Sequence, residues 1–427
     1  TLKIDGKYLY EVENPDFKKI LLGDYLTKIK EISKKDAVCS ICGEKKEEVF
    51  TTSLIYRFYT LDKECYITSG FKKKNAWKNF PVCVDCFLKI DYGKKYVENN
   101  LKFKFYRKEY YLIPKLILNT PEALEEINEI LSMEAGKLTL SKERKATLTD
   151  DKDEILELLK DYKDVVSFYF LFLKGGGKAD SDKILLLIED VLPSRIHKIF
   201  DVKTKIDELF GQDYNFGRLV NFLNEFDKTL LEVVDKIFRG GNVDFRTLIQ
   251  IFNRKIRDEF VNGNNFSFSV MDALMNVRFL EELGILNTEV KTMEETRFEK
   301  IYQKVGRSLN TPAKRGIFLL GALTQMLLNI QGKERGSTPF FKNLKGLKMN
   351  EEDIKGLLPK VINKLMEYNK FDPGKKELAE EISKNLLSQE KFSLSIDGIN
   401  FYFASGMALY KEVADMVYQN EEQNQTN

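Results

Sequence analysis

Apolar and polar residues alternate in the first half of the chain, whereas apolar residues recur at helical spacing in the second half. Period-two alternation and short apolar runs predict strands, because successive side chains of a strand point to opposite faces. The expected strands cover residues 1–10 (a strand or hairpin), 51–60, 102–106, 110–118, 165–173 and 184–188. The last two are joined by Gly175-Gly176-Gly177 and a polar tip, which is typical of a hairpin.

Helical periodicity in the first half is confined to short stretches. We expect helices at 17–32, at 86–100, from Thr120-Pro121, at about 154–161 and from Pro193, with a polar loop at 136–153. From residue 215 onward nearly every stretch is helical, with breaks at 240–241, 262–265 and 284. Further helices are expected at 352–368, 376–388 and 397–419.

One helix, from Ala313 to about Gln331, carries apolar residues on most of its sides. Thr311 and Pro312 precede it as N-terminal signals, because threonine caps a first turn and proline is tolerated there. A helix that is apolar all round must be buried. We therefore expect this helix at the centre of an antiparallel helical bundle.

Together these patterns predict an α+β protein that is mainly α in its second half. A chain of 427 residues suits two to four domains. We expect an α+β lobe at residues 1–120, a mixed middle domain with the hairpin and helices at 121–290, and the C-terminal helical bundle at 291–427. No apolar run reaches the length that a membrane-spanning helix needs, and the strand-like N-terminal residues do not form a signal peptide.

Four of the five cysteines form two Cys-x-x-Cys pairs, Cys39 with Cys42 and Cys83 with Cys86. Each pair places two sulfur atoms on one tight turn, and two pairs supply the tetrahedral thiolate set of a structural zinc ion. No βαβ pattern surrounds either pair, which disfavours a thioredoxin-like redox site. Cysteines in metal spacing fit a reducing cytoplasm better than a secreted disulfide framework. The fifth cysteine, Cys65, is expected to be a small half-buried thiol.

The net charge of +2 conceals four blocks of alternating sign. Residues 1–120 carry a net charge of +8, residues 121–296 of −10, residues 297–348 of +9 and residues 349–427 of −5. A basic block is typical of a surface that binds a polyanion such as nucleic acid, although solvated helix faces give the same count. The solvated-face interpretation is weaker for residues 297–348, which contain only two acidic residues.

In the first basic block, residues 70–81 combine lysines with aromatic residues. Lysines can neutralise phosphates while aromatic rings stack on bases. The candidate nucleic-acid ligands in this segment are Lys72, Lys73, Lys74 and Lys78. The alternative is that the sole tryptophan, Trp77, packs beside the zinc site while the lysines face water.

The second basic block holds three groups of candidate nucleic-acid ligands. Lys314 and Arg315 lie in the first turn of the helix 313–331, where cations oppose the helix dipole, a cost that an anion or solvent exposure offsets. The other candidates are Lys333 and Arg335 in a basic turn, and Lys342, Lys345 and Lys348. The last three recur every third residue, so a helix of about two turns would gather them on one face, with Leu344 and Leu347 on the other.

The single histidine, His197, stands between the basic residues Arg195 and Lys198, which favours a surface position. Ser-His-Asp, Cys-His and histidine-rich metal catalysis would all have to use this one ring. The three glycines at 175–177 are not followed by the lysine and helix of a phosphate-binding loop. We therefore expect a protein that is not an enzyme.

Four stretches of the chain resemble a known family. They are residues 75–83 (Asn-Ala-Trp-Lys-Asn-Phe-Pro-Val-Cys), 103–106 with 110–116, 186–195, and 328–331 with 333–337. In these stretches the chain resembles the large subunit of the type I-B CRISPR effector complex Cascade, the Cas-eight b group. The resemblance spans nearly the whole chain. The family's N-terminal region, upstream of Thr1, is expected to be missing, and Thr1 is not a start methionine.

The resemblance implies a non-catalytic subunit of an RNA-guided surveillance complex. Such subunits help recognise the protospacer-adjacent motif, hold the displaced DNA strand and help recruit the helicase-nuclease, while guide RNA reads the sequence. The implied partners are the backbone subunits that carry guide RNA, target double-stranded DNA, its displaced single strand and the helicase-nuclease, with no membrane. The C-terminal bundle resembles the small subunit, which this family can also make from an internal start such as Met275 or Met293. The rival interpretations are a zinc-stabilised nuclease and a free-standing protein-interaction scaffold.

Overall fold

The computed structural model describes residues 33–52, 63–105, 108–117, 166–174, 182–286, 295–388 and 390–424, with Met293 and shorter pieces among residues 3–8, 55–61 and 125–131. The chain divides into two compact units. Unit 1 comprises residues 1–115, 120–143 and 168–189, and unit 2 comprises residues 116–119, 144–167 and 190–427. The helices expected at 17–32 and 154–161, the helix start at 120–121 and the loop at 136–153 lie outside the described residues. The three-domain division stays a prediction.

The first sheet of unit 1 has three antiparallel strands in the order β3 (Ser33–Val38), β4 (Lys45–Thr51) and β5 (Pro81–Val82). Along the chain, the short 3-10 helices η3 (Glu64–Tyr66) and η4 (Lys73–Lys78) lie between β4 and β5, and α2 (Val84–Asn100) follows β5. Val49 and Phe50 from β4 and Phe87 from α2 are buried in its core. A separate hairpin is formed by β1 (Lys3–Ile4) and β2 (Lys7–Tyr8), as expected for residues 1–10.

The strand expected at 51–60 is wrong, because β4 ends at Thr51 and begins at Lys45. After β4 the chain turns, and the N–H of Ile55 donates to the carbonyl oxygen of Thr52 at 2.9 Å. Ile55 reaches the core from this turn. Polar residues 45–48 form the strand instead, since they pair with β3. Pairing with a neighbouring strand outweighs the strand propensity of the later residues.

The second sheet of unit 1 has the order β6 (Lys102–Phe105), β7 (Lys108–Leu116), β8 (Val166–Lys174) and β9 (Lys183–Val191). The strands expected at 102–106 and 110–118, and the hairpin of 165–173 with 184–188, are confirmed within one to three residues at their ends. Alternate aromatic residues of β8, such as Phe170 and Phe172, are buried, and the ring of Tyr110 lies 5.5 Å from that of Phe170. The alternation that predicted these strands therefore reflects one buried face.

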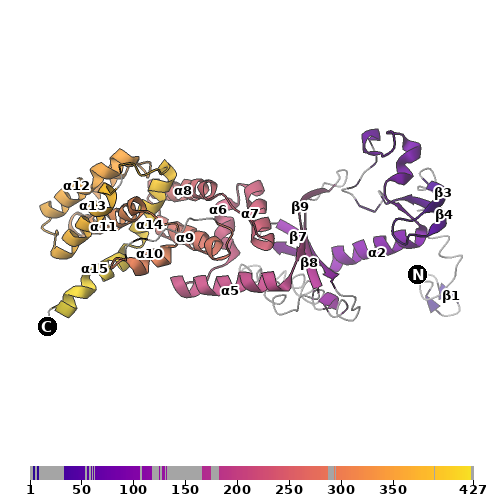
Figure 1. Ribbon diagram of the computed structural model, residues 1–427, viewed down its shortest axis with the longest axis horizontal. Helices are drawn as coiled ribbons and strands as arrows, with labels where there is room; N and C mark the ends of the chain where they lie inside the picture. The colour runs from indigo at the N-terminus through magenta and orange to yellow at the C-terminus, as the bar shows by residue number, and fades with distance from the viewer. Residues whose placement is uncertain are drawn as a thin grey trace. The chain divides into compact units, whose positions relative to one another are not determined.

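From Pro193 onward the described part of unit 2 consists of helices and their connections (Figure 1). They are α5 (Pro193–Phe210), α6 (Phe216–Leu223), α7 (Asp227–Arg239), α8 (Phe245–Val261), α9 (Phe266–Glu282), α10 (Glu299–Val305), α11 (Pro312–Arg335), η6 (Pro339–Leu344), α12 (Glu351–Glu367), α13 (Pro373–Leu387), α14 (Ile396–Ala408) and α15 (Tyr410–Asn424). The predicted α+β class, mainly α in the second half, is confirmed. Glycines with left-handed φ, including Gly240 and Gly284, mark the expected breaks.

Helix α11 is the centre of the C-terminal helices, as its apolar sequence predicts. The side chain of Thr311 caps it by accepting from the N–H of Lys314 at 3.3 Å. Helices α12, α13, α14 and α15 all pack against α11. Side chains on every side of it, such as Phe318, Leu320 and Leu323, are fully buried.

The single helix expected at 397–419 is instead two helices, α14 and α15, separated at Leu409. Leu409 is buried, and its backbone leaves the helical conformation with φ of −96° and ψ of 15°. The break allows both helices to pack against α11, which one straight helix would not do. Among the described residues, no helix is both long and apolar enough to cross a membrane.

Candidate metal centre and nucleic-acid interface

Cys39, Cys42, Cys83 and Cys86 come together in unit 1, with their Sγ atoms all within 4.8 Å of one another. A tetrahedral ion with Zn–S bonds of about 2.3 Å needs sulfur atoms about 3.8 Å apart, so small side-chain shifts would complete the coordination. The four cysteines could therefore hold a metal ion and are compatible with structural zinc. Four protein ligands leave no open position for a reactive water.

The elements of the first sheet position the cysteines. Cys39 directly follows β3, and the N–H of Gly43 donates to its carbonyl oxygen at 3.0 Å. Gly43 has φ of 71°, a left-handed conformation that glycine adopts without strain. Cys83 follows β5 and is the N-cap residue of α2, so Cys86 lies in the first turn of that helix. The positive end of the helix dipole favours a thiolate there.

The cysteines differ in how readily they ionise. Burial by itself raises the pKa of Cys39, but the backbone N–H groups of Cys42, Cys83 and Ile41 lower the pKa to about 6 by stabilising the thiolate. The donations from Ile41 and Cys83 are both 3.4 Å long. Burial, together with hydrogen bonds and charge from Cys83 and Cys39, raises the pKa of Cys86 to about 12. A bound divalent cation would hold both Cys39 and Cys86 as thiolates despite their different pKa values, because it stabilises the thiolate form of every ligand.

Cys65 does not join the cluster. It lies in η3 and is exposed, which corrects the expectation of a half-buried thiol. None of the residues of η3 is buried, because this short helix lies on the surface of the lobe. Cys65 is therefore a natural control for experiments on the other four cysteines.

The lysine-rich segment before the second cysteine pair is exposed. Lys72, Lys73, Lys74 and Lys78 all face solvent around η4. Trp77 is half-buried and packs against the core cluster that includes the cysteines, so the packing interpretation of this residue is confirmed. The side chain of Asn79 connects the segment to residues 66–68 by two hydrogen bonds of 2.9 Å. It accepts from the N–H of Thr68 and donates to the carbonyl oxygen of Tyr66.

The two cations in the first turn of α11 are buried or half-buried, whereas the other candidate nucleic-acid ligands are exposed. Arg315 is only 7% exposed, its Nη2 atom lies 3.3 Å from a carboxylate oxygen of Glu299, and its guanidinium stacks 4.3 Å from the ring centre of Tyr302. Half-buried Lys314 donates to Asn310 at 2.6 Å. The carboxylate of Glu299, rather than a ligand, offsets the helix dipole at Arg315. Arg315 is therefore not accessible to a polyanion.

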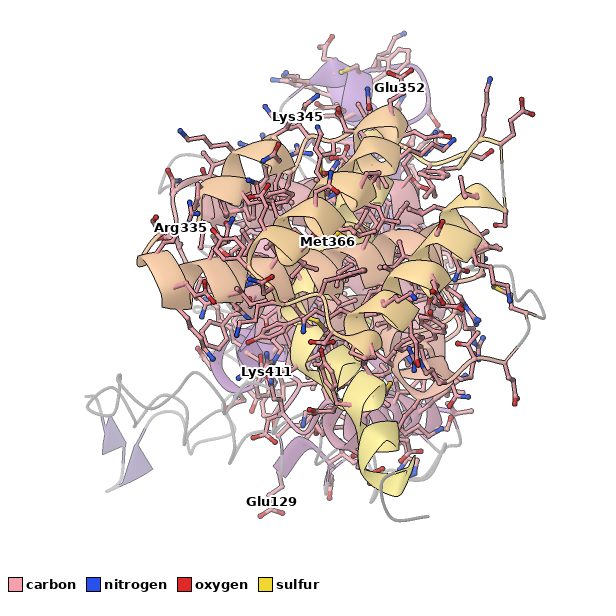
Figure 2. All side chains as sticks on the ribbon, turned by 90° about the vertical axis from the view of Figure 1, so that its left-hand side faces the viewer. Glu129, Arg335, Lys345, Glu352, Met366 and Lys411 are labelled. Carbon is pink, nitrogen blue, oxygen red and sulfur yellow. The ribbon has the colours of Figure 1, made fainter. Side chains whose placement is uncertain are left out.

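Lys333 and Arg335 lie in the last turn of α11, where cations interact favourably with the helix dipole. Both are exposed. The guanidinium of Arg335 lies 5.1 Å from the ring centre of Tyr368, and Arg335 projects from the end of α11 in Figure 2. These two side chains are accessible to a polyanion.

Lys342, Lys345 and Lys348 do not lie on one helix face, which corrects the prediction from their spacing. The 3-10 helix η6 ends at Leu344, and the chain then makes a left-handed turn. The division into exposed and buried side chains is nevertheless as expected, because the three lysines are exposed while Leu344 and Leu347 are buried. Two buried leucines and a tight turn, rather than a helix, orient the lysines.

Sequence reasoning missed two residues that contact this loop, Arg257 in α8 and Asn400 in α14. Both contacts join residues far apart in the chain. The only signal in the sequence was a polar residue, Asn400, within the apolar run 399–404. A buried polar side chain needs hydrogen-bond partners, which is what the loop supplies.

His197 is on the exposed side of α5, with its Nε2 atom 3.3 Å from a carboxylate oxygen of Asp201 one turn later. Its side chain is 52% exposed. The surface position predicted from its basic neighbours is therefore confirmed.

Two comparisons bear on the family of the chain. Residues 36–191 match the family model of the central domain of CRISPR-associated protein TM1802, and residues 214–421 match that of its C-terminal domain. Together the two matches cover most of the chain, and they include the four cysteines and every candidate lysine. No curated protein matches the chain.

Proposed function

Because the chain belongs to the CRISPR-associated TM1802 family, we propose that it is the non-catalytic large subunit of a type I-B CRISPR effector complex, Cascade. In this role it helps recognise the flanking motif of the target, binds target DNA and the displaced strand, and helps recruit the helicase-nuclease. Guide RNA held by the backbone subunits reads the target sequence by base pairing.

The observation that carries the DNA-binding part of this proposal is the set of exposed lysines at the end of α11 and in the loop after it. Lys333, Lys342, Lys345 and Lys348 are exposed, whereas Phe340, Leu344 and Leu347 are buried. Ammonium groups at intervals along a surface suit the regularly spaced phosphates of a nucleic-acid strand. This surface requires no particular base sequence, which agrees with a protein that leaves sequence reading to RNA.

We propose that the four cysteines hold a structural zinc ion, which stabilises the lobe formed by residues 33–100. A closed ligand set supplies folding free energy and no catalysis. The position of His197 also supports a subunit without its own nuclease chemistry, since this side chain is 52% exposed and pairs with Asp201 on the surface of the same helix.

The small subunit of such a complex could be made from an internal start, and the two candidate methionines differ in their positions. Met275 is buried within α9, so a product beginning there would start inside a packed helix. Met293 lies between α9 and α10, and a product beginning there would retain α10 to α15 whole. We therefore favour Met293 as the start. Mass spectrometry of the native complex that found no separate C-terminal fragment would exclude both.

Reversing Lys342, Lys345 and Lys348 to glutamate is expected to weaken target-DNA capture by the assembled complex. If each lysine neutralises one phosphate of a single strand, affinity falls on the order of 50-fold at about 0.15 M salt. The slope of log Kd against log salt concentration then also falls by about 2. Fluorescence anisotropy at several salt concentrations measures both quantities.

The matched control reverses three exposed lysines elsewhere in the same unit, Lys370 between α12 and α13, Lys376 in α13 and Lys411 in α15. It changes the net charge equally and is expected to retain most of the affinity and slope. Unchanged capture by the first variant, with a normal salt slope, contradicts the proposed interface. Cleavage of DNA by the purified chain with magnesium or manganese would favour the rival nuclease instead.

A further inference from the structure

The loop that presents Lys342, Lys345 and Lys348 has an unusual backbone. Lys345, Gly346 and Leu347 have φ of 48°, 59° and 56° in succession. Glycine adopts this left-handed conformation freely, whereas lysine and leucine are strained in it. Such strain persists only where the surrounding structure imposes it, and it is often found at functional sites.

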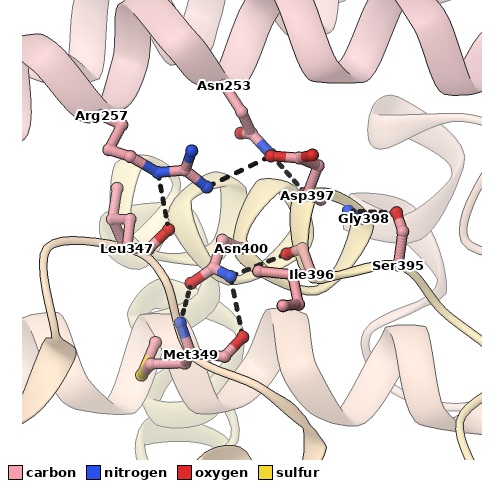
Figure 3. Close-up of polar contacts among 9 residues, drawn as sticks. All are labelled: Asn253, Arg257, Leu347, Met349, Ser395, Ile396, Asp397, Gly398 and Asn400. Atoms are coloured by element: carbon pink, nitrogen blue, oxygen red, sulfur yellow. Dashed lines mark hydrogen bonds and ion pairs between the residues drawn. The ribbon is translucent and has the colours of Figure 1, made fainter.

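Side chains from two helices impose this conformation (Figure 3). The guanidinium of Arg257 in α8 donates to the carbonyl oxygen of Leu347 at 3.0 Å and pairs with Asp397 in α14 at 3.2 Å. Asn400 in α14 accepts from the N–H of Met349 at 3.1 Å and donates to the carbonyl oxygen of the same residue at 2.9 Å. Leu347 and Met349 are buried, so the loop is fixed by both packing and hydrogen bonds.

The turn also leaves backbone donors available. A right-handed residue followed by a left-handed one directs successive N–H groups to the same side, and Leu344 and Lys345 form such a pair. Within the described part of the chain, the N–H groups of Lys345 and Gly346 have no hydrogen-bond acceptor. In contrast, the left-handed Gly336 donates to the carbonyl oxygen of Gly332 at 3.1 Å, and Gly284 to that of Glu281 at 3.0 Å.

The charge around these donors is suited to an anion. The side chain of Lys345 is 58% exposed, and Lys342 and Lys348 are exposed on either side of it. One carboxylate opposes them, since Asp353 pairs with the Nζ atom of Lys345 at 2.6 Å. Asp353 also accepts from the N–H of Asn350 at the start of α12, so it is held there by the helix cap. An arriving anion would compete with Asp353 for one ammonium group, while both backbone donors remain available.

We infer that the turn Lys345–Leu347 is a binding site for one phosphate group, and that Arg257 and Asn400 are its positioning residues. The identification of that phosphate as part of a nucleic-acid backbone rests on the proposed function. The N–H groups of Lys345 and Gly346 supply directed donors, and the lysines supply charge. A loop held by buried contacts presents these groups without the ordering that a flexible segment requires on binding.

Nuclear magnetic resonance of the full chain labelled with [15N]glycine tests the site directly. The Gly346 amide signal is identified by its loss in Gly346→Asn, since asparagine tolerates a left-handed backbone. Titration with inorganic phosphate, against chloride at equal ionic strength, is expected to shift the Gly346 signal saturably. The signals of Gly211 and Gly284, whose N–H groups already donate to the carbonyl oxygens of Asp207 and Glu281, are expected to stay in place. A Gly346 signal that does not respond overturns the inference.

Three variants distinguish phosphate binding by the backbone N–H groups from binding by positive charge alone. Arg257→Gln is expected to abolish the phosphate response of Gly346, whereas Arg254→Gln on the same helix removes an equal charge and is expected to keep it. Arg254 is exposed and pairs with Glu225 instead of the loop. Lys345→Gly retains the left-handed backbone and is expected to keep a weaker response. Its complete loss in folded Lys345→Gly protein would assign binding to the lysine alone and overturn the backbone site.

Capture of single-stranded DNA, duplex DNA and RNA by the assembled complex distinguishes this inference from the proposed function. Arg257→Gln is expected to lower the salt slope by about 0.7 to 0.9, the contribution of one phosphate. If Gly346 responds to phosphate but the wild-type complex captures no DNA, the phosphate site stands and the proposed function fails. If DNA capture is normal and Arg257→Gln leaves the slope unchanged, the inference fails alone.

Discussion

Replacing Cys83 by serine is expected to unfold the lobe formed by residues 33–100 while the helices of unit 2 stay folded. The lobe has a small core, of which Cys39, Cys83 and Cys86 are themselves members. Such a core supplies little stability, whereas a structural zinc ion can supply about 10 kcal/mol of apparent folding free energy. Serine is a poor zinc ligand at neutral pH, so the variant loses the ion and with it most of that free energy.

Metal analysis together with hydrogen exchange measures this result. Residues 33–100 of Cys83→Ser are expected to exchange rapidly and the protein to contain no zinc, while α11 keeps its protection. Cys65→Ser is the matched control, because Cys65 is exposed and outside the cluster, and it is expected to retain both zinc and protection. A metal-free Cys83→Ser protein with a fully protected lobe would refute a structural metal.

Gly406→Ala is expected to cause the second large loss, this time in unit 2. Helices α11 and α14 cross so closely that a Cβ atom at Gly406 would overlap the carbonyl oxygen of Phe318, and one at Gly321 would overlap that of Phe403. The obstacle is backbone in both cases, which cannot rotate away as a side chain can. Separating the helices would open the core around α11, so we expect a loss of about 3 kcal/mol or more in the free energy of unfolding.

Chemical denaturation followed by circular dichroism measures the change. Gly356→Ala in α12 is the control, since a Cβ atom there meets no neighbour, and it is expected to stabilise the protein by up to ~1 kcal/mol. Equal stability of Gly406→Ala and the wild type would show that α11 and α14 do not approach each other as described.

Features that depend on neighbours in the sequence could be predicted well. The Cys-x-x-Cys spacing puts two sulfur atoms on one turn whatever the fold, and the turn at Gly43 follows from the same local geometry. Helix α11 was predictable from Thr311, Pro312 and its apolar surface, because these determine where a helix begins and whether it is buried. The alternation in β6 and β8 likewise reflects one buried face.

Features that depend on distant residues could not be predicted. The strand at 45–51 exists because it pairs with β3, and its polar first half carries no apolar alternation. The spacing of Lys342, Lys345 and Lys348 fits a helix, but this segment forms a left-handed turn instead. Arg257 holds that turn by donating to the carbonyl oxygen of Leu347, 90 residues later in the chain. Arg315 has the sequence context of an exposed cation, yet Glu299 and Tyr302 bury it. In each case a tertiary contact outweighs the local pattern.

Co-purification tests the central claim most directly. The tagged chain is expressed together with its neighbouring genes, and any nucleic acid that accompanies it is extracted and sized. As the large subunit of a type I-B effector complex, the chain is expected to bring RNA of one discrete length and a repeated backbone subunit. Clean protein without RNA, despite expressed neighbours, would contradict this account and leave a free-standing metal-stabilised scaffold.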